Sequence, residues 1–510
     1  MKSRTKNVML NVSSSFIITI IKTILTFINR TIFIYCLGKQ ALGLNGLFTN
    51  ILSMLSLAEL GIGTAINFSL YKPLAEKNEK KISILMSFYK KTYRIIGICV
   101  AILGICLMPF LKFLIKDISS IENVYIIFIF YLINTVSSYF ISYKETLINA
   151  DQKKYKLIKI EVLFITILNF FQIIVLLITK NFIYYLGIQI LIQLIQRIAV
   201  NFYINKMYKN IDFNSKQKIE KKDMQLIKKN VKAMFFHKIG DYCINGTDNL
   251  IISSFINISI VGLYSNYLTI IALLNTFINL IYSNLTSSLG NLVVTETDEK
   301  KYEIFKIMDY IGYILYGFSA VILICIFNDF ISIWIGNQYC IEYISVILIV
   351  TNFYLVGMRV PASTLKSAAG LYDVDKFTPL IQSIINLFFS IILVKKIGLL
   401  GVIVGTTISS ILLPSWQRPY IVYKYIFKKS VVEYYIKYVK YLVVISISTL
   451  LTLLISNYIY LDNIFIILIC KIVISSILFT IFSYLLFGKT EEINYIKGIV
   501  KKITKRSKKK

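Results

Sequence analysis

Predominantly apolar runs of 18 or more residues recur from one end of this 510-residue chain to the other. Such runs are longer than a core helix of a soluble domain needs, and about 20 apolar residues are enough for a helix to cross a bilayer. The mean hydropathy of +0.70 and the charged fraction of 16% agree with this interpretation. The sequence therefore predicts an all-α polytopic membrane protein.

Fourteen segments are long enough to span, each joined to the next by a short polar connection. Their expected limits are 8–36, 42–70, 95–115, 123–143, 160–179, 182–204, 234–255, 260–293, 307–328, 342–365, 377–394, 398–422, 441–458 and 463–487. The two ends and the even-numbered loops hold 43 of the 56 Lys and Arg residues, and the opposite loops hold six. Because cytoplasmic loops are enriched in Lys and Arg, both termini are predicted to lie in the cytoplasm.

The formal net charge of +30 follows the same pattern, with lysines clustered between apolar runs rather than on one binding face. The loop 216–232 and the tail 497–510 are the most basic stretches. Anionic headgroups of membrane lipids are the partners that such segments attract. We therefore expect contacts with membrane lipids and no nucleic-acid partner.

A weak internal repeat divides the chain. The stretch from Leu37 aligns with the stretch from Ile256, and the two share Gly-Leu at 43–44 and 262–263. Six predicted helices separate the copies, which gives both the same orientation, so the repeat is parallel about an axis along the membrane normal. We expect an N-terminal lobe at 1–233 (helices 1–6), a C-terminal lobe at 234–430 (helices 7–12), and two appended helices with a basic cytoplasmic tail at 431–510. Paired lobes are more typical of transporters than of membrane enzymes.

Several charged residues remain deep inside the predicted spans. A charge near the bilayer centre costs about 2.5–3.5 kcal/mol, so a deep charge normally faces a cavity or a partner. Counting 1.5 Å per residue puts four charges at one level near the midplane and two at a second level about 10 Å below the outer surface. The first set is Lys22, Glu59, Asp241 and Arg359, and the second is Arg30 and Asp248.

The two matched levels predict a hydrated, charge-lined cavity, with a simple structural ion pair between Lys22 and Glu59 as the alternative. Arg30, Lys22 and Arg359 would bind an anionic headgroup, because guanidinium grips phosphate oxygens in a bidentate manner and ammonium supplies a point charge. Glu59, Asp241 and Asp248 would be cavity acids that pair with these cations or take part in coupling. Gly61 and Gly63 would let the second helix bend or pack closely beside Glu59.

Other features of the sequence exclude a catalytic or metal centre. His237 is the only histidine, and the seven cysteines are scattered through apolar segments without a CxxC spacing. No phosphate-binding, metalloprotease or nucleophile-elbow motif occurs. We expect no catalytic residue, no metal and no cofactor, with transport driven by a proton gradient, a sodium gradient or the membrane potential.

Two regions resemble a known family. The stretches LSLAELGIGTAI (55–66) and LYKPLAEKNEKKI (70–82) are similar to the second helix and following loop of bacterial polysaccharide repeat-unit (O-antigen/capsule, Wzx-type) flippases. These belong to the multidrug/oligosaccharidyl-lipid/polysaccharide exporter superfamily. The region 368–409 and YKYIFKKS (423–430) resemble the helix 11–12 region of the same family. One departure is Gln382, where an acidic residue is expected in related sequences.

The resemblance implies a two-lobed, alternating-access flippase of the bacterial cytoplasmic membrane. It would move polyprenyl-pyrophosphate-linked oligosaccharide repeat units to the outer leaflet for capsule, O-antigen or exopolysaccharide assembly, with a glycan polymerase and glycosyltransferases as partners. The alternatives are a cation-coupled multidrug exporter of the same superfamily and a membrane glycan polymerase or acyltransferase. Exporters of the first kind resemble one another in an acidic residue on helix 1, where this chain carries Lys22 and Arg30.

Overall fold

The computed structural model describes residues 2–59, 62–116, 118–221, 223–225, 227–228, 231, 246–371, 374–459, 461, 463–495 and 497–498. Within these residues the chain is helical and contains no strand, as the sequence predicts. By contacts it divides into two compact units, 1–262 and 263–510. The predicted lobe boundaries at 233 and 430 stay a prediction.

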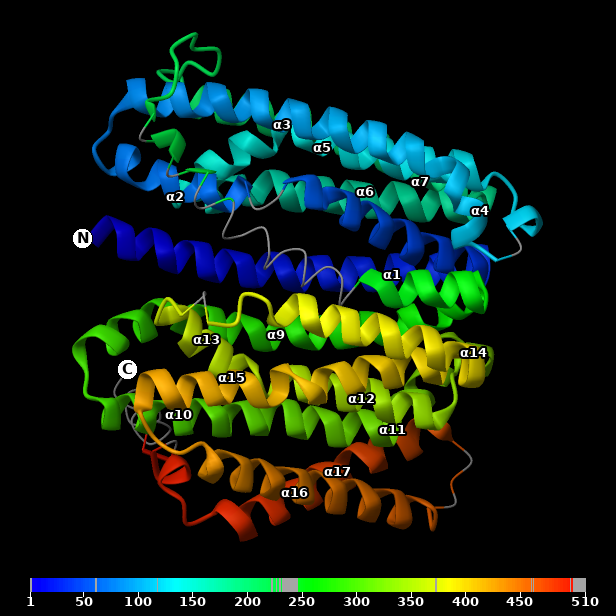
Figure 1. The fold of residues 1–510 in the computed structure, drawn as a ribbon. Coiled ribbons are helices and arrows are strands. Elements are labelled where there is room, and N and C mark those ends of the chain that lie inside the picture. Colours follow the sequence, from blue (N-terminus) through cyan, green and yellow to red (C-terminus); the bar gives the residue numbers. More distant parts are fainter. Residues whose placement is uncertain are drawn as a thin grey trace, which may run out of the picture. The chain divides into compact units, whose positions relative to one another are not determined.

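The first unit is a set of long helices joined by short connections (Figure 1). It contains α1 (Lys2–Leu55), α2 (Ile62–Ala75), α3 (Glu79–Leu107), α4 (Leu111–Leu114), α5 (Val124–Ala150), α6 (Ile158–Thr179) and α7 (Phe182–Met207). Helix α3 packs on α5, α5 on α7, and α6 on both α1 and α7. Side-chain caps fix where α3 and α7 begin. The side chains of Asn78 and Asn181 accept hydrogen bonds from backbone N–H groups in the first turn of α3 and of α7, respectively.

The second unit begins within α9 (Ile258–Thr295), which follows a helical stretch at 246–255. Its further helices are α10 (Asp298–Gly312), α11 (Phe318–Ile335), α12 (Tyr343–Gly357), α13 (Val360–Ala368), α14 (Thr378–Leu412), α15 (Pro414–Val422), α16 (Val432–Ser456) and α17 (Ile464–Phe487). A π-helical turn at Tyr313–Gly317 joins α10 to α11 as one span. Helices α16 and α17 pack on each other and on α11.

Eleven helices in the described part of the chain are long and apolar enough to cross a membrane. The protein is therefore a multi-pass membrane protein. Two of the eleven, in α1 and α14, each cover a pair of segments that the sequence predicts as separate spans. The predicted span 234–255 falls largely outside the described residues. The total of fourteen spans stays a prediction.

Helix α14 is a hairpin of two arms rather than one rod. The backbone leaves helical geometry at Ile397 and Gly398, and Gly398 has a φ of 58°, which favours glycine. Beyond the bend, a Cβ on Gly405 would lie 2.2 Å from the Ser390 hydroxyl, and one on Gly401 would lie 2.3 Å from the backbone of Leu393. Gly401 and Gly405, four residues apart, thus let the second arm approach the first closely.

Two glycines of the internal repeat, Gly43 of α1 and Gly262 of α9, make close contacts within the first unit. A Cβ on Gly43 would lie 1.9 Å from the backbone oxygen of Ile258, and one on Gly262 would lie 2.3 Å from that of Lys39. Both contacts join a glycine to the residue four positions before the other glycine. The contact is therefore reciprocal. The parallel repeat of the two lobes stays a prediction.

Two further cations within the spans, Lys471 and Arg197, form hydrogen bonds or ion pairs with polar side chains of neighbouring helices. Lys471 of α17 forms an ion pair of 2.6 Å with Asp329 of α11. Arg197 of α7 donates to Asn134 at 2.9 Å and to the hydroxyl of Ser137, both on α5. Both cations thus have polar partners within their own unit.

Candidate functional site

A cavity of ≈ 840 Å³ lies in the first unit among α1, α6 and α7, and Gln152, Lys154 and Tyr155 before α6 also line it. Each helix contributes residues at a spacing of three or four, so one face of each helix lines the cavity. The α1 face carries Lys22, Thr26, Asn29, Arg30 and Phe33. The α6 face carries Glu161, Ile165, Leu168, Asn169 and Gln172, and the α7 face carries Tyr185, Gln189, Gln193 and Gln196.

The deeper wall of the cavity is a network of amides centred on Asn29. Its amide nitrogen donates to Asn169 at 3.0 Å and to Gln172 at 2.8 Å, and its oxygen accepts from the Tyr185 hydroxyl at 3.2 Å. Gln172 in turn donates to Gln189 at 3.3 Å. Asn29, Asn169 and Gln172 are all buried. The network joins three helices in an apolar region, where buried amides must be satisfied.

These hydrogen bonds also show which residues of α1, α6 and α7 lie at the same depth in the cavity. Residue 29 of α1 is level with residues 169 and 172 of α6 and with residue 185 of α7. Seven residues earlier on α1, Lys22 lies about 10 Å away along the axis. Since α6 runs with α1 and α7 runs against it, Glu161 of α6 and Gln193 of α7 fall near that same level. The cavity therefore has one level around Arg30 and the amides, and a second around Lys22, Glu161 and Gln193.

Two of the predicted headgroup residues line this cavity together. Lys22 is exposed to it and Arg30 is half-buried in it. Arg359 belongs to the second unit, where it is 6% exposed and interacts electrostatically with Arg418, Tyr434 and Tyr438. The anion-binding roles of all three residues stay predictions.

The predicted acids lie in different surroundings. The Glu59 carboxylate accepts a hydrogen bond of 3.0 Å from Tyr93 of α3, and no ion pair within 4.0 Å joins it to Lys22 in the described part of the chain. In place of the alternative Lys22–Glu59 ion pair, the structure has a Tyr93–Glu59 hydrogen bond, because Glu59 faces α3. A Cβ on Gly63 would lie 2.7 Å from both groups, so the predicted close packing at this glycine is confirmed. Asp248 is buried in the first unit, and Asp241 and Gly61 lie outside the described residues.

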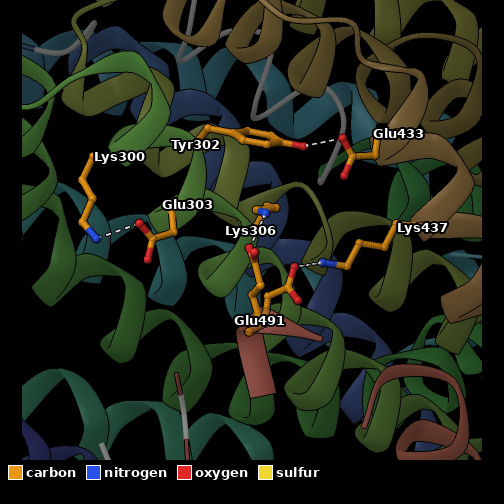
Figure 2. Close-up of polar contacts among 8 residues, drawn as sticks. Lys300, Tyr302, Glu303, Lys306, Glu433, Lys437 and Glu491 are labelled. Carbon is orange, nitrogen blue, oxygen red and sulfur yellow. Dashed lines mark hydrogen bonds and ion pairs between the residues drawn. The ribbon is translucent and has the colours of Figure 1, made fainter. Parts of the chain in front are cut away.

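The second unit contains a polar cluster where the C-terminal segment packs on α10 and α16 (Figure 2). Tyr302 donates to Glu433 at 2.8 Å, Lys306 pairs with Glu491 at 3.0 Å, and Lys437 pairs with Glu492 at 2.6 Å. Burial would raise the pKa of Glu492, but the hydrogen bond from Lys437 and its charge outweigh burial and hold that pKa below its ordinary value. The cluster ties the segment after α17 to the rest of the unit.

A buried acid lies beside this cluster. Asp309 of α10 is 2% exposed, and in the described residues its carboxylate accepts only one hydrogen bond, a long one of 3.4 Å from Tyr441. Tyrosine rings of α16 and of the turn 423–427 surround it, including Tyr434 and Tyr423. The space between them has a volume of only ≈ 10 Å³, which is about that of one water molecule.

Sequence reasoning missed Glu161, Asp309 and the amides of the cavity. Both acids fall within predicted spans, 160–179 and 307–328, so the argument from depth applies to them as it does to Glu59. The amides carry no charge, and their signal is the spacing of Gln189, Gln193 and Gln196 along one face of an otherwise apolar helix.

Comparisons with solved structures show the same fold in known membrane transporters. The lipid II flippase MurJ in an inward closed conformation has a TM-score of 0.61 and 19% identity, and the match covers 92% of this chain and 99% of that one. An inward-facing multidrug resistance MATE family transporter of the MOP superfamily has a TM-score of 0.59 and 14% identity, covering 78% and 94%. The Vibrio cholerae MATE transporter VcmN has a TM-score of 0.56 and 12% identity, covering 82% and 97%.

At the level of sequence, none of the curated proteins matches this chain. A family model described as polysaccharide biosynthesis protein matches residues 8–285, which is more than half of the chain and includes every residue that lines the cavity. The fold of the flippase and transporter superfamily and this match agree with the resemblance found in the sequence. The chain belongs to the polysaccharide biosynthesis protein family.

Proposed function

We propose that this protein flips a polyprenyl-pyrophosphate-linked oligosaccharide across the bacterial cytoplasmic membrane by alternating access, with both termini in the cytoplasm. The observation that carries the proposal is the cavity of ≈ 840 Å³ that places Lys22 and Arg30 on one helix face, opposite a wall of amides. Cations suit the pyrophosphate, and amides suit the hydroxyl groups of sugars. A polyprenyl chain needs no protein cavity, because it can stay in the bilayer.

The charge of the cavity weighs against the alternative of a cationic-drug exporter. The α1 face presents two cations to the cavity, and a cationic drug would have to bind against both. An anionic headgroup gains from the same two charges, and more so inside a membrane protein than in water. The match to the polysaccharide biosynthesis family also favours a glycan substrate.

The proposal predicts that Arg30 is needed for export but not for folding. In cells that lack the chromosomal gene, an Arg30→Ala copy should leave the lipid-linked glycan accumulated in the membrane, as an empty vector does. Arg30→Lys should restore export in part, because a point charge replaces the planar fork. The readout is extraction and mass analysis of lipid-linked intermediates, with protein amount in the membrane measured in parallel.

The matched control is Arg94→Ala, which removes an exposed arginine of α3 outside the cavity and should export normally. Full export by Arg30→Ala would refute the anionic-cavity model. A deletion strain that accumulates no lipid-linked intermediate would refute the proposed flippase function itself.

A further inference from the structure

A second basic feature of the first unit is a groove of ≈ 360 Å³ at the end where α5 and α7 finish. Its walls come from α3, α5 and α7 and from the loop that follows α7. The lining residues are Lys90, Lys144, Asn205, Tyr208, Lys209, Ile211, Asp212, Phe213 and Asn214. None of them lines the cavity around Arg30, so the groove is a separate feature.

The most deeply placed cation of the groove is Lys144 of α5, which is 5% exposed. Its ammonium donates to the amide oxygens of Asn201 and Asn205, both on α7. The ammonium also lies 4.6 Å from the centre of the Phe213 ring. These partners are neutral, and the nearby charge of Lys90 repels it. A buried ammonium group attracts an anion more strongly than a hydrated one does.

The acids at the groove leave it positively charged. Asp212 lines it, and its carboxylate accepts the backbone N–H of Asn214 at 2.8 Å. Tyr208 donates to Asp151 at 2.7 Å, but Asp151 already forms an ion pair of 2.6 Å with Lys153. With three lysines and one acid, the lining of the groove has an excess of two positive charges.

Hydrogen bonds hold the loop after α7 against α3, which fixes the shape of the groove. The backbone N–H of Asp212 donates to the Ser83 hydroxyl at 3.0 Å, and the ammonium of Lys90 donates to the amide oxygen of Asn214. Holding a loop in this way requires hydrogen bonds and not net charge. The tethers therefore do not account for the gathering of three lysines at one groove.

The groove lies at the ends of the predicted spans. Its α3 wall, with Lys90, precedes Ile95, where an expected span begins. Its α5 and α7 walls follow Tyr143 and Ile204, where two other expected spans end. The headgroup layer, about 5–7 Å thick on each side, begins where the hydrocarbon core ends. This is the level at which basic groups meet lipid phosphates.

We propose that this groove binds a phosphate group at the membrane surface, either that of an anionic lipid headgroup or free phosphate. Lys90, Lys144 and Lys209 supply positive charge, and ammonium groups form charge-assisted hydrogen bonds with phosphate. The amide oxygens of Asn205 and Asn214 accept from lysines, which leaves the amide nitrogens as further donors. The proposal is independent of the proposed function.

The test measures the affinity of the purified full-length protein, in a nonionic detergent, for water-soluble dihexanoyl phosphatidylglycerol and for inorganic phosphate. Dihexanoyl phosphatidylcholine, which has the same acyl chains and no net charge, should bind at least tenfold more weakly than the phosphatidylglycerol. Lys144→Met should weaken binding of the anionic probe about tenfold, the effect of one charge-assisted hydrogen bond. Lys209→Met should weaken it about threefold.

Two variants keep the test clear of folding effects and of general surface charge. Lys209 is exposed, and its ammonium forms no hydrogen bond or ion pair in the described part of the chain, so Lys209→Met changes only the charge of the groove. The matched control is Lys80→Met, which removes an exposed lysine near the start of α3 outside the groove. It should keep the wild-type affinity.

Tight binding of phosphatidylglycerol with weak binding of inorganic phosphate would identify a lipid headgroup as the ligand, and equal affinities would identify the phosphate group alone. Failure of both probes to bind, or binding that Lys144→Met and Lys209→Met leave unchanged, would overturn the proposal. A loss with Lys80→Met as large as that with Lys144→Met would also overturn it, since the attraction would then be nonspecific. Binding that Arg30→Ala abolishes and the groove variants retain would belong to the cavity and refute a site in the groove.

Discussion

The reciprocal contact between Gly43 and Gly262 makes a quantitative prediction about stability. A methyl group on Gly43 would lie 1.9 Å from the backbone oxygen of Ile258, about 1.5 Å short of an ordinary contact of 3.4 Å. The obstacle is backbone on both sides, so no side-chain rotation relieves it and the two helices must move apart. Overpacking a tight site costs about 1–3 kcal/mol, and a clash with backbone falls at the upper end of this range or beyond.

Gly43→Ala should therefore lower the thermal midpoint of the purified protein in detergent by roughly 3 °C, because a chain of 510 residues shifts by only about 1 °C per kcal/mol and the cost is about 3 kcal/mol. Gly262→Ala should cost somewhat less, because its Cβ would lie 2.3 Å from the oxygen of Lys39. The double variant should cost less than the sum, since separating the helices for one methyl group makes room for the other.

Gly187→Ala is the matched control, because it changes a glycine of α7 whose Cβ would lie 3.6 Å from the Phe130 ring, an ordinary contact. It should leave the midpoint nearly unchanged or raise it, since alanine favours a helix over glycine by up to about 1 kcal/mol. A Gly43→Ala protein that melts together with Gly187→Ala would show that the helix crossing is looser than the contact distances indicate. Strictly additive effects in the double variant would refute the argument from a shared crossing.

Three further predictions concern charged contacts and topology. Glu492→Gln should lower the thermal midpoint at neutral pH but not in acid. Because the pKa of Glu492 is lowered in the folded protein, the carboxylate stabilises the fold above its ordinary pKa. This stabilisation is lost as the pH falls through the pKa of the folded state. Lys471→Met should destabilise the protein by about 1–3 kcal/mol, and adding Asp329→Asn should recover part of this, because the second change removes the uncompensated charge. Reporter fusions after Asn210 and at the C-terminus should give cytoplasmic signals and a fusion near Gln338 an external one, and a cytoplasmic signal near Gln338 would refute the predicted topology.

The sequence predicts the fold well because the bilayer imposes a length on every spanning helix. Runs of about 20 apolar residues have few alternatives to crossing the membrane as helices, and glycines mark where the arms of α1 and α14 bend. What apolar length alone does not determine is which helices pack together. The sequence indicated a relation between Gly43 and Gly262 only because the internal repeat aligns the two positions, and it did not predict that their helices touch.

The site was harder to predict, since depth gives the level of a residue but not the direction in which its side chain points. Lys22 and Glu59 lie at similar depth on consecutive spans, which suggested a pair. The structure turns Lys22 toward α6 and α7 and Glu59 toward Tyr93 of α3. A rotation of 100° per residue along a helix decides such cases, and a single sequence does not state which face of a helix meets which neighbour.

The bonding within the cavity also indicates which positions can change without harm to the fold. Asn29, Asn169 and Gln172 tie α1, α6 and α7 together through hydrogen bonds in a buried region, so replacing any of them leaves buried polar groups unsatisfied. Gln193 and Glu161 line the same cavity, and neither is among the residues that form this network. If the protein carries a glycan as proposed, the second level of the cavity can vary while the first level keeps the three helices in place. On this reasoning a change of substrate sugar requires substitutions around Glu161 and Gln193, and Arg30 stays, because every substrate of the proposed class carries the same pyrophosphate.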